Sequence, residues 1–385
     1  MVIIRKPRSH FEMKVLIAID SMKGSLGSIE GGEAVAAGVR RVFPDAVCEV
    51  RPLADGGEGT VEALVSGLGG ELRRVTVTGP AQKPVEAVYG VIGRTAVMEM
   101  ASAAGITLVS GEEKNPLLTT TFGVGEMIAD AVRQGARKFI VGIGGSATND
   151  GGAGMLQALG FRLLDAGGRE LPRGGAALAR LAAIDSSRVL PELKDCVFKI
   201  ACDVVNPLCG GNGASAVYGP QKGATPEMVA ELDAALGVFA AVSGGDGEFP
   251  GSGAAGGLGF AFRTFLGGEL KSGVELVLEE TGFEERVRGA DIVVTGEGRL
   301  DEQTVMGKAP IGVARAAKKY GKKVIAFSGC VTDGARKVNE HGIDAFFPIL
   351  RSVVTLEEAL DRRNAAGNLT DTAEQVFRCL RLSAP

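Results

Sequence analysis

Three polar segments rich in glycine constrain this 385-residue chain more than any other feature of its sequence. They are Pro52–Thr60, Gly142–Gly152 and Gly296–Thr304, and each joins glycines to carboxylates, amides or hydroxyls. Glycine lets main-chain N–H groups approach a ligand closely and tolerates positive φ, at an entropic cost that structure alone rarely justifies. Oriented N–H groups bind phosphate and nearby carboxylates bind Mg²⁺. The three segments therefore predict a site for a nucleotide and a second substrate.

Composition excludes several classes of protein. The chain is 45% apolar and 23% charged, which is typical of a soluble globular protein, and its length predicts two domains. The net charge of −4, the absence of Trp and the lack of a long basic run argue against nucleic-acid and anionic-membrane partners. No apolar run reaches the roughly 18 residues of a membrane span. We expect a cytoplasmic protein, with residues 1–12 as a disordered extension.

The order of predicted elements indicates a parallel sheet at both ends of the chain. Short continuous apolar runs at Lys14–Asp20 and Val47–Leu53 are typical of buried parallel strands, and Ser28 is the expected N-cap of the helix between them. Between residues 72 and 101, strand-like segments follow one another without a helix, which predicts a mixed sheet. Strand–helix alternation returns after residue 288.

We therefore predict an α/β protein made of two α/β domains. Residues 13–74 and 289–385 would form a discontinuous flavodoxin- or Rossmann-like domain with a parallel sheet, and residues 75–288 an inserted domain with a mixed sheet. The apolar run at Phe161–Asp165 is assigned to the inserted sheet, and the glycine-rich stretch Gly244–Gly259 is expected to be a loop. Ligand sites concentrate in clefts between domains, so we expect the active site there.

Polar side chains follow the first predicted strand. Asp20, Ser21, Lys23 and Ser25 lie where ligands bind in doubly wound sheets, at the carboxyl ends of strands. Lys23 offers a compact positive charge to a phosphate, and the two hydroxyls can donate hydrogen bonds. The structural alternative is an ordinary turn from strand to helix.

Two carboxylates flank a glycine pair after the second strand. Asp55 and Glu58 enclose Gly56 and Gly57. Mg²⁺ is held in many enzymes by one or two carboxylates together with substrate phosphates, so Asp55 and Glu58 are candidate metal ligands and the glycines candidate phosphate contacts. A tight turn before a helix is the alternative.

The second glycine segment imitates a dinucleotide-binding fingerprint. Gly142–Ala147 matches G-x-G-x-x-[GA] after a strand, and Asp165 follows about 20 residues later, as a ribose-binding acid would. However, the polar run Thr148–Gly152 stands where a Rossmann helix would begin to pack. We favour phosphate or substrate binding at a helix start, with a structural glycine turn as the alternative. The candidate contacts are Gly144, Gly145, Ser146, Asn149 and Asp150.

An acid follows the strand-like run that ends at residue 202. Asp203 is the candidate base that accepts a hydroxyl proton, as an aspartate does in protein kinases. Asn206 lies three residues on, and Gln221 and Lys222 could contact phosphate or nucleotide. A turn at Asn206 with a capping aspartate is the alternative.

The third segment supplies acids, a guanidinium that can grip a carboxylate with two hydrogen bonds, and a lysine. A Walker A motif is excluded, because Glu302 and Ala309 occupy positions where it requires glycine and a hydroxyl residue. The candidate contacts are Gly296, Glu297, Arg299, Asp301, Gln303, Thr304 and Lys308.

Taken together and in this order, the motifs resemble the bacterial glycerate kinases of the first type. The resemblance implies ATP-dependent phosphorylation of D-glycerate with Mg²⁺, at the 2-hydroxyl to give 2-phosphoglycerate, with 3-phosphoglycerate as the alternative product. It also implies two α/β domains with the active site between them. We expect glycerate and ATP as the ligands, no nucleic-acid or membrane partner, and a monomer or homodimer.

On this reading Asp203, Lys23 and Asp301 are the expected catalytic residues. Asp203 would take the hydroxyl proton and Lys23 would stabilise the transferring phosphoryl group. Arg299 or nearby N–H groups would hold the carboxylate of glycerate, and Mg²⁺ would bind to Asp55, Glu58 or Asp301. Two other classes remain open: an NAD(P)-dependent oxidoreductase acting on a small hydroxy acid, and a non-catalytic sensor of small molecules.

Overall fold

The computed structural model describes residues 12–57 and 59–382, and its contacts divide the chain into two units. Unit 1 comprises Met1–Ala54 and Val277–Pro385, and unit 2 comprises Asp55–Leu276. Glu58 and all of the expected N-terminal extension except Glu12 lie outside the described residues. No helix in the described ranges combines the length and the apolar composition that a membrane crossing requires.

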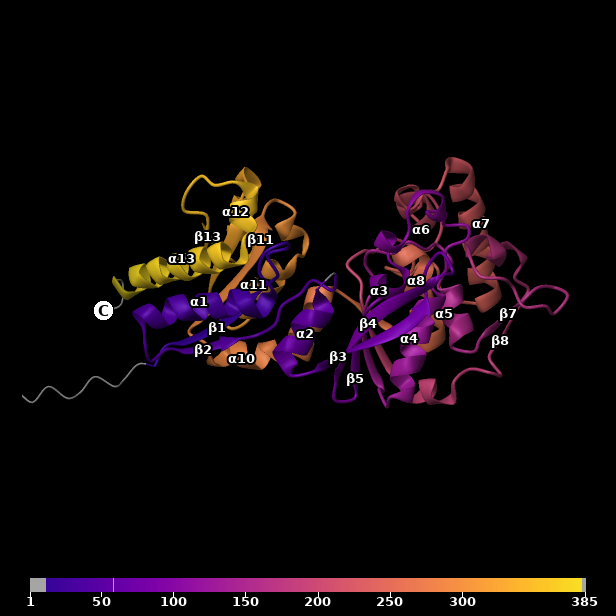
Figure 1. The fold of residues 1–385 in the computed structure, drawn as a ribbon, viewed down its shortest axis with the longest axis horizontal. Coiled ribbons are helices and arrows are strands. Elements are labelled where there is room, and N and C mark those ends of the chain that lie inside the picture. Colours follow the sequence, from indigo (N-terminus) through magenta and orange to yellow (C-terminus); the bar gives the residue numbers. More distant parts are fainter. Residues whose placement is uncertain (1–11, 58, 383–385) are drawn as a thin grey trace, which may run out of the picture. The chain divides into compact units, whose positions relative to one another are not determined.

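Unit 1 is built around a parallel five-stranded sheet with the order β13-β12-β11-β1-β2 (Figure 1). Counted within the unit, this is the 2-1-3-4-5 order of flavodoxin-like folds. The strands are β1 (Lys14–Ile19), β2 (Val47–Val50), β11 (Ile292–Leu300), β12 (Lys323–Val331) and β13 (Ala345–Pro348). The continuous apolar runs form these buried strands because helices cover a parallel sheet on both faces.

Two long helices pack side by side on one face of this sheet. α1 (Ser28–Val42) and α13 (Arg362–Leu382) bury Val35, Val39 and Phe377 against Ile17 and its neighbours. α1 links β1 to β2, whereas α11 links β11 to β12 in the opposite direction along the sheet. Right-handed crossovers in opposite directions place their helices on opposite faces. The remaining helices of the unit are α10 (Phe283–Gly289), α11 (Ala309–Lys318) and α12 (Leu356–Leu360).

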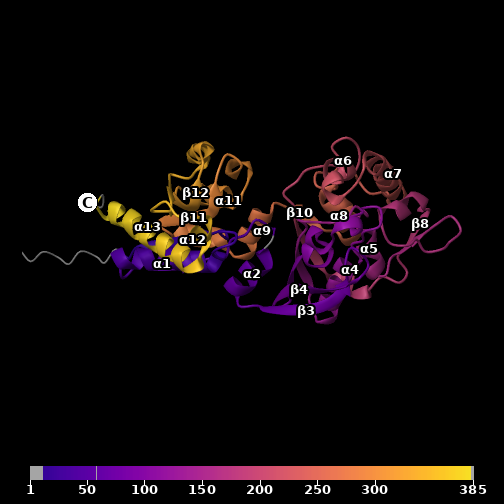
Figure 2. The same ribbon diagram turned by 45° about the horizontal axis from the view of Figure 1, so that its top comes forward.

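Unit 2 contains a mixed six-stranded sheet with the order β10-β9-β6-β5-β4-β3, of which β10, β4 and β3 are labelled in Figure 2. β3, β4 and β5 pair antiparallel, and the pairs from β5 to β10 are parallel. The mixed α/β fold class is therefore confirmed. The strands are β3 (Glu71–Thr78), β4 (Pro84–Ile92), β5 (Thr95–Glu99), β6 (Lys138–Gly142), β9 (Val197–Ala201) and β10 (Glu269–Lys271).

The helices of unit 2 pack on this sheet and on one another, and α4 and α5 lie side by side in both views (Figures 1 and 2). Stacked rings of Phe139 and Phe198 join β6 to β9 within the core. The helices are α2 (Thr60–Leu68), α3 (Ala101–Ala104), α4 (Phe122–Arg133), α5 (Ala153–Ala158), α6 (Ala214–Tyr218), α7 (Pro226–Ser243) and α8 (Ala254–Leu266). A further helix, α9 (Gly273–Glu280), begins in unit 2 and continues past Leu276, the last residue of the unit.

The division between the units differs from the expected boundary at residue 75. Unit 2 already begins at Asp55 and includes α2. The reason is packing, because Val61 and Val65 of α2 lie against Gly90 of β4, where a Cβ would approach Val65 Cγ2 to 2.3 Å. The chain therefore enters unit 2 within the first glycine segment, Pro52–Thr60.

The hydrogen bonding extends one strand beyond what the sequence indicated and corrects the assignment of another. The third glycine segment is largely strand, because β11 continues to Leu300 and pairs with β12 through Leu300↔Val331. The apolar run at Phe161–Asp165 does not join the main sheet: β7 (Arg162–Leu164) pairs with β8 (Ala183–Asp185) in a separate two-stranded sheet.

Two local predictions are also wrong. Ser28 is not the N-cap of α1, which is Gly27; the Ser28 hydroxyl instead accepts a hydrogen bond from Leu53 N–H at 2.8 Å. The loop predicted over Gly244–Gly259 ends early, because α8 begins at Ala254 and then breaks its helical geometry at residues 255–257. No sequence pattern indicates the positive φ of 53° at Ala255.

Candidate active site

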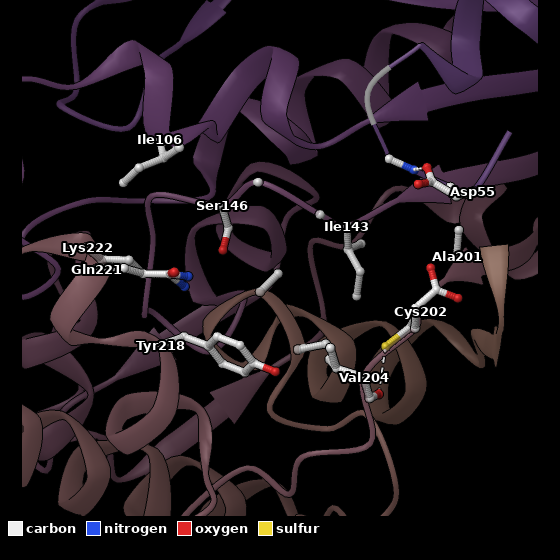
Figure 3. A pocket seen from close by; sticks show the side chains of 17 residues that line it. Asp55, Ile106, Ile143, Ser146, Ala201, Cys202, Val204, Tyr218, Gln221 and Lys222 are labelled. Carbon is white, nitrogen blue, oxygen red and sulfur yellow. Dashed lines mark hydrogen bonds between the residues drawn. The ribbon is translucent and has the colours of Figure 1, made fainter. Parts of the chain in front are cut away.

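A cavity of about 460 Å³ opens in unit 2 where β6 and β9 end (Figure 3). It gathers side chains and main chain from three of the predicted motifs. The predicted residues that line it are Asp55, Gly56, Gly57, Gly144, Gly145, Ser146, Asp203, Gln221 and Lys222.

Close packing of the main chain brings the two carboxylates of the cavity together. Gly56 has a φ of +84°, and a Cβ there would lie 2.6 Å from the Cβ of Ala201 and 2.9 Å from the Cα of Gly273. A Cβ on Gly142 would lie 2.3 Å from the carbonyl oxygen of Gly56. Only glycine permits both the backbone conformation and this approach. The segment with Asp55 therefore rests directly on the end of β9.

Backbone N–H groups orient both carboxylates. Gly57 N–H donates to Asp55 Oδ1 at 2.9 Å, and Gly273 N–H donates to Asp203 Oδ1 at 3.0 Å. Asp203 remains accessible from the cavity, but the protein atoms packed around its carboxyl displace water and raise its pKa. The charge of Asp55 raises that pKa further, and the hydrogen bond from Gly273 opposes the rise. A carboxylate with a raised pKa is a better proton acceptor than an ordinary aspartate.

The glycine loop after β6 forms the next part of the wall. Ile106 N–H donates to the carbonyl of Gly145 at 2.8 Å, and Ala147 N–H donates to that of Ala104 at 2.9 Å. These bonds hold the loop against the segment after α3. Gly145 needs its φ of +73°, and the side chain of Ser146 points into the cavity (Figure 3). The loop can therefore offer main-chain groups and one hydroxyl to a ligand.

Asp150 and Lys222 belong to a buried network behind this wall. Asp150 is fully buried and accepts hydrogen bonds from Thr121 N–H, Thr121 Oγ1, Gly152 N–H and Gly154 N–H at 2.8–3.2 Å. Lys222 is 1% exposed and donates from Nζ to Thr148 O at 2.6 Å. Burial raises the pKa of Asp150, and burial lowers that of Lys222 to about 7 although Asp150 opposes the fall. Both side chains hold the loop from inside.

Two predicted amides form hydrogen bonds with other side chains and main chain of the protein. Asn149 is fully buried and donates to Ser215 Oγ at 2.8 Å. Asn206 accepts a hydrogen bond from Tyr218 Oη at 2.7 Å and donates to Asn212 O at 2.8 Å. Tyr218, which was not singled out from the sequence, is thereby fixed at the cavity. The other lining residues that the sequence did not indicate are Ile106, Ile143, Ala201, Cys202, Val204, Ala254 and Ala255.

The remaining candidates lie in unit 1, at the switch point of its sheet. There the strand order reverses between β1 and β11, and ligands of doubly wound sheets bind at the carboxyl ends of such strands. Asp20 follows β1, and its N–H donates to Gly296 O at 2.9 Å. Ser21 N–H donates to the Asp20 carboxylate at 2.7 Å, Lys23 is exposed, and Ser25 Oγ is buried with no hydrogen-bond partner among the described residues.

A charged cluster lies at the end of β11. Lys308 Nζ is 3.3 Å from Asp301 Oδ1 and 4.0 Å from Glu297 Oε2, and Arg299 Nε is 3.4 Å from Asp301 Oδ2. Burial alone would raise the pKa of Asp301, but the charge and hydrogen bond of Lys308 lower it overall. Thr304 Oγ1 donates to Glu297 Oε1 at 2.7 Å, and Gln303 is exposed. The charged residues of the third glycine segment, together with Lys308, thus form one charged surface of unit 1.

The cavity of unit 2 fits Mg²⁺ by the chemistry of its donors. Mg²⁺ is bound through one or two carboxylates and completes its shell with water and substrate phosphates. Asp55 and Asp203 supply two carboxylates in one cavity. In the described part of the chain, no three His, Cys, Asp or Glu side chains come together as a metal-binding group.

The dinucleotide-binding alternative does not fit the observed geometry. Ten residues separate β6 from α5, which is only six residues long and starts from a left-handed Gly152. A Rossmann loop passes instead directly into a long helix that receives the pyrophosphate. Asp165, the expected ribose-binding acid, is used in its own turn, where Gly167 N–H and Arg169 N–H donate to it.

Comparison with known proteins gives one consistent result. The model of the glycerate kinase family matches residues 15–381. The chain is 49% identical to the glycerate 2-kinase of Escherichia coli K12, over 96% of this chain and 98% of that protein, and 49% identical to the glycerate kinase of Bacillus subtilis 168 with the same coverage. The crystal structure of a glycerate kinase 2 from Salmonella typhimurium LT2 superposes with a TM-score of 0.89 at 47% identity, covering 96% of this chain and 99% of that one.

The close packing at Gly56 predicts an unequal effect of two alanine substitutions. Gly69→Ala places a side chain at a φ of +72° with no atom within 4 Å, so it should cost about 1–2 kcal/mol of unfolding free energy. Gly56→Ala adds the contacts with Ala201 and Gly273 to a similar backbone strain and should cost clearly more. Urea unfolding measures both; equal losses would contradict the packing argument.

The buried network predicts a large effect of Asp150→Asn. All four of the aspartate's partners are donors, so an amide nitrogen would face an N–H or O–H group, and Lys222 would lose its counter-charge. Each buried polar group left without its hydrogen bond costs about 1–3 kcal/mol. The matched control is Asp165→Asn, which alters an aspartate of a surface turn and should cost much less. Similar melting temperatures for the two variants would argue against the network.

Proposed function

Because the chain belongs to the glycerate kinase family, we propose that it transfers the γ-phosphoryl group of ATP to the 2-hydroxyl of D-glycerate, with Mg²⁺, giving 2-phosphoglycerate and ADP. The E. coli relative, named a glycerate 2-kinase, supports the 2-position, and 3-phosphoglycerate is the alternative product. The observation that carries the proposal is the cavity in which Asp55 and Asp203 stand beside the glycine loop.

Asp203 acts in this proposal as the general base. Its carboxylate accepts the proton of the glycerate hydroxyl while that oxygen bonds to the γ-phosphorus and the bond from phosphorus to the ADP oxygen breaks. Gly273 N–H fixes the orientation of the carboxylate, and burial and Asp55 raise its pKa. Its position at an accessible cavity wall, instead of in the interior like Asp150, supports the assignment.

Asp55 is the proposed metal ligand of the same cavity. When bound, Mg²⁺ neutralises phosphate charge, which lowers the repulsion that an incoming oxygen meets. The main chain of Gly56, Gly57, Gly144 and Gly145 can approach phosphate oxygens closely because no side chain intervenes. Asp150 and Lys222 support this loop from behind.

The roles of the unit 1 side chains stay predictions. Lys23 remains the candidate for stabilising the transferring phosphoryl group, and Arg299 for holding the carboxylate of glycerate. Asp301 remains the second candidate metal ligand, although Lys308 and Arg299 already pair with it. The cytoplasmic location and the monomeric or dimeric state likewise remain predictions.

The product identifies the reaction and its position together. We expect the full chain, given ATP, Mg²⁺ and D-glycerate, to release ADP in a coupled assay. Phosphorus-decoupled proton NMR of the product should show the phosphate on carbon 2. A phosphate on carbon 3 would overturn the position but not the activity, and no ADP release above the rate without glycerate would overturn the proposal.

Asp203→Asn should abolish most turnover without unfolding the chain. The amide keeps the shape of the side chain but cannot take a proton, and general-base catalysis contributes roughly 100- to 10,000-fold to a rate. We expect kcat to fall within this range while the melting temperature stays near that of the unchanged chain. Asp195→Asn, at an exposed acid outside the cavity, serves as the control. If kcat of Asp203→Asn matched the control, another group would be the base.

A further inference from the structure

The cavity of unit 2 has two chemically different ends. Asp55 lies at one end and Ile106, Tyr218 and Gln221 at the other, with Ser146 between them (Figure 3). A cavity of about 460 Å³ is far larger than a three-carbon acid requires, since pockets of roughly 300–1,000 Å³ enclose ligands of nucleoside size and larger. The end away from the carboxylates is therefore available to another part of the ligand.

The side chains at that end match a flat heteroaromatic ring. The ring of Tyr218 is held in place because its hydroxyl donates to Asn206 Oδ1 at 2.7 Å. Ile106 is held by the bond of its N–H to Gly145 O at 2.8 Å. An aromatic ring and an aliphatic side chain fixed around one space provide a surface on which any nucleobase stacks.

Gln221 supplies the polar group at the same end. Its residue surface is exposed, its amide lies at the cavity, and it makes no side-chain hydrogen bond to the described residues (Figure 3). A glutamine amide carries a donor and an acceptor side by side, which match the amino group and the adjacent ring nitrogen of adenine. Lys222, the next residue, cannot play this part because it is buried and its Nζ points to Thr148 O.

We propose that this end of the cavity is the nucleobase subsite and that Gln221 determines the preference for adenine, an inference that rests on the proposed function. The base stacks between Tyr218 and Ile106. The phosphates then extend past the glycine loop at Ser146 toward Asp55, which lies at the opposite end of the cavity (Figure 3). Of these two neighbouring residues, Gln221 thereby contacts the nucleobase and Lys222 belongs to the protein interior.

Gln221→Glu tests the assignment through nucleotide preference. A carboxylate only accepts hydrogen bonds, so it repels the ring nitrogen of adenine but accepts from the N–H and amino groups of guanine. A bidentate base contact is worth roughly 10- to 100-fold in discrimination, so the ratio of kcat/KM for ATP to that for GTP should fall by this factor. The KM for glycerate should not change. Gln134→Glu adds the same charge at an exposed helix end of unit 2 and should leave the ratio unchanged.

Tyr218 provides a second, independent comparison. Tyr218→Phe keeps the ring and loses only the hydroxyl bond to Asn206, whereas Tyr218→Leu removes the stacking surface, so the leucine variant should raise KM for ATP and GTP alike by tenfold or more and the phenylalanine variant by clearly less. If Gln221→Glu proves unstable in thermal melts, the two Tyr218 variants test the nucleobase subsite on their own.

The other possible outcomes contradict either the nucleobase subsite or the proposed function. An unchanged nucleotide ratio in folded Gln221→Glu, or equal KM values for the two Tyr218 variants, overturns the subsite. A raised KM for glycerate with unchanged nucleotide kinetics overturns it in favour of an acid-binding end. Failure of the unchanged chain to phosphorylate glycerate with any nucleotide contradicts the proposed function itself, and is therefore distinguishable from failure of the subsite.

Discussion

The contact of Gly56 with the end of β9 is the constraint on which the candidate site depends. Asp55 and Asp203 come from distant parts of the chain, and they share a cavity because the main chain at Gly56 packs directly on Ala201 and Gly273. Gly142 packs on the carbonyl of Gly56 from β6. Any side chain at these points would force the segments apart. The glycines thus allow one main-chain segment to pack closely against another. This close packing creates the ligand site.

The charged residues of the motifs fall into two physical classes. Asp203 and Asp55 stand at the cavity wall, where each accepts a backbone hydrogen bond and keeps carboxylate oxygen available to a ligand. Asp150 and Lys222 are buried, and burial of charge is tolerated only when hydrogen bonds and an opposite charge compensate for lost water. We infer that the second class fixes the glycine loop, so that the first class can keep its orientation during a reaction.

Much of the architecture follows from simple sequence patterns. Continuous apolar runs such as Lys14–Ile19 indicate buried parallel strands because both faces are covered, and consecutive strands without helices after residue 70 indicate the mixed sheet. The glycine fingerprint after β6 marked a real loop at the cavity, and the polar run Thr148–Gly152 already favoured phosphate or substrate binding over a dinucleotide site. The structure adds the shortness of α5, which the sequence pattern did not indicate.

Other features depend on tertiary contacts that no local pattern contains. β11 runs on through Gly296 and Gly298 because β12 pairs with it on both sides of Gly298, although glycine is unfavourable in strands. Asp150 and Asp203 both follow a strand in the sequence. Asp150 is buried and accepts hydrogen bonds from four donor groups, whereas Asp203 faces the cavity. Tyr218 and Ile106 carry no motif; they become lining residues only because α6 and the segment after α3 are packed around the glycine loop.

The most direct test of the account is a crystal structure of the full chain with Mg²⁺ and a non-hydrolysable ATP analogue. The base should lie between Tyr218 and Ile106, the phosphates along Gly144–Ser146, and the metal on the carboxylate of Asp55. A nucleotide bound elsewhere on the protein, with this cavity filled only by water, would contradict the account.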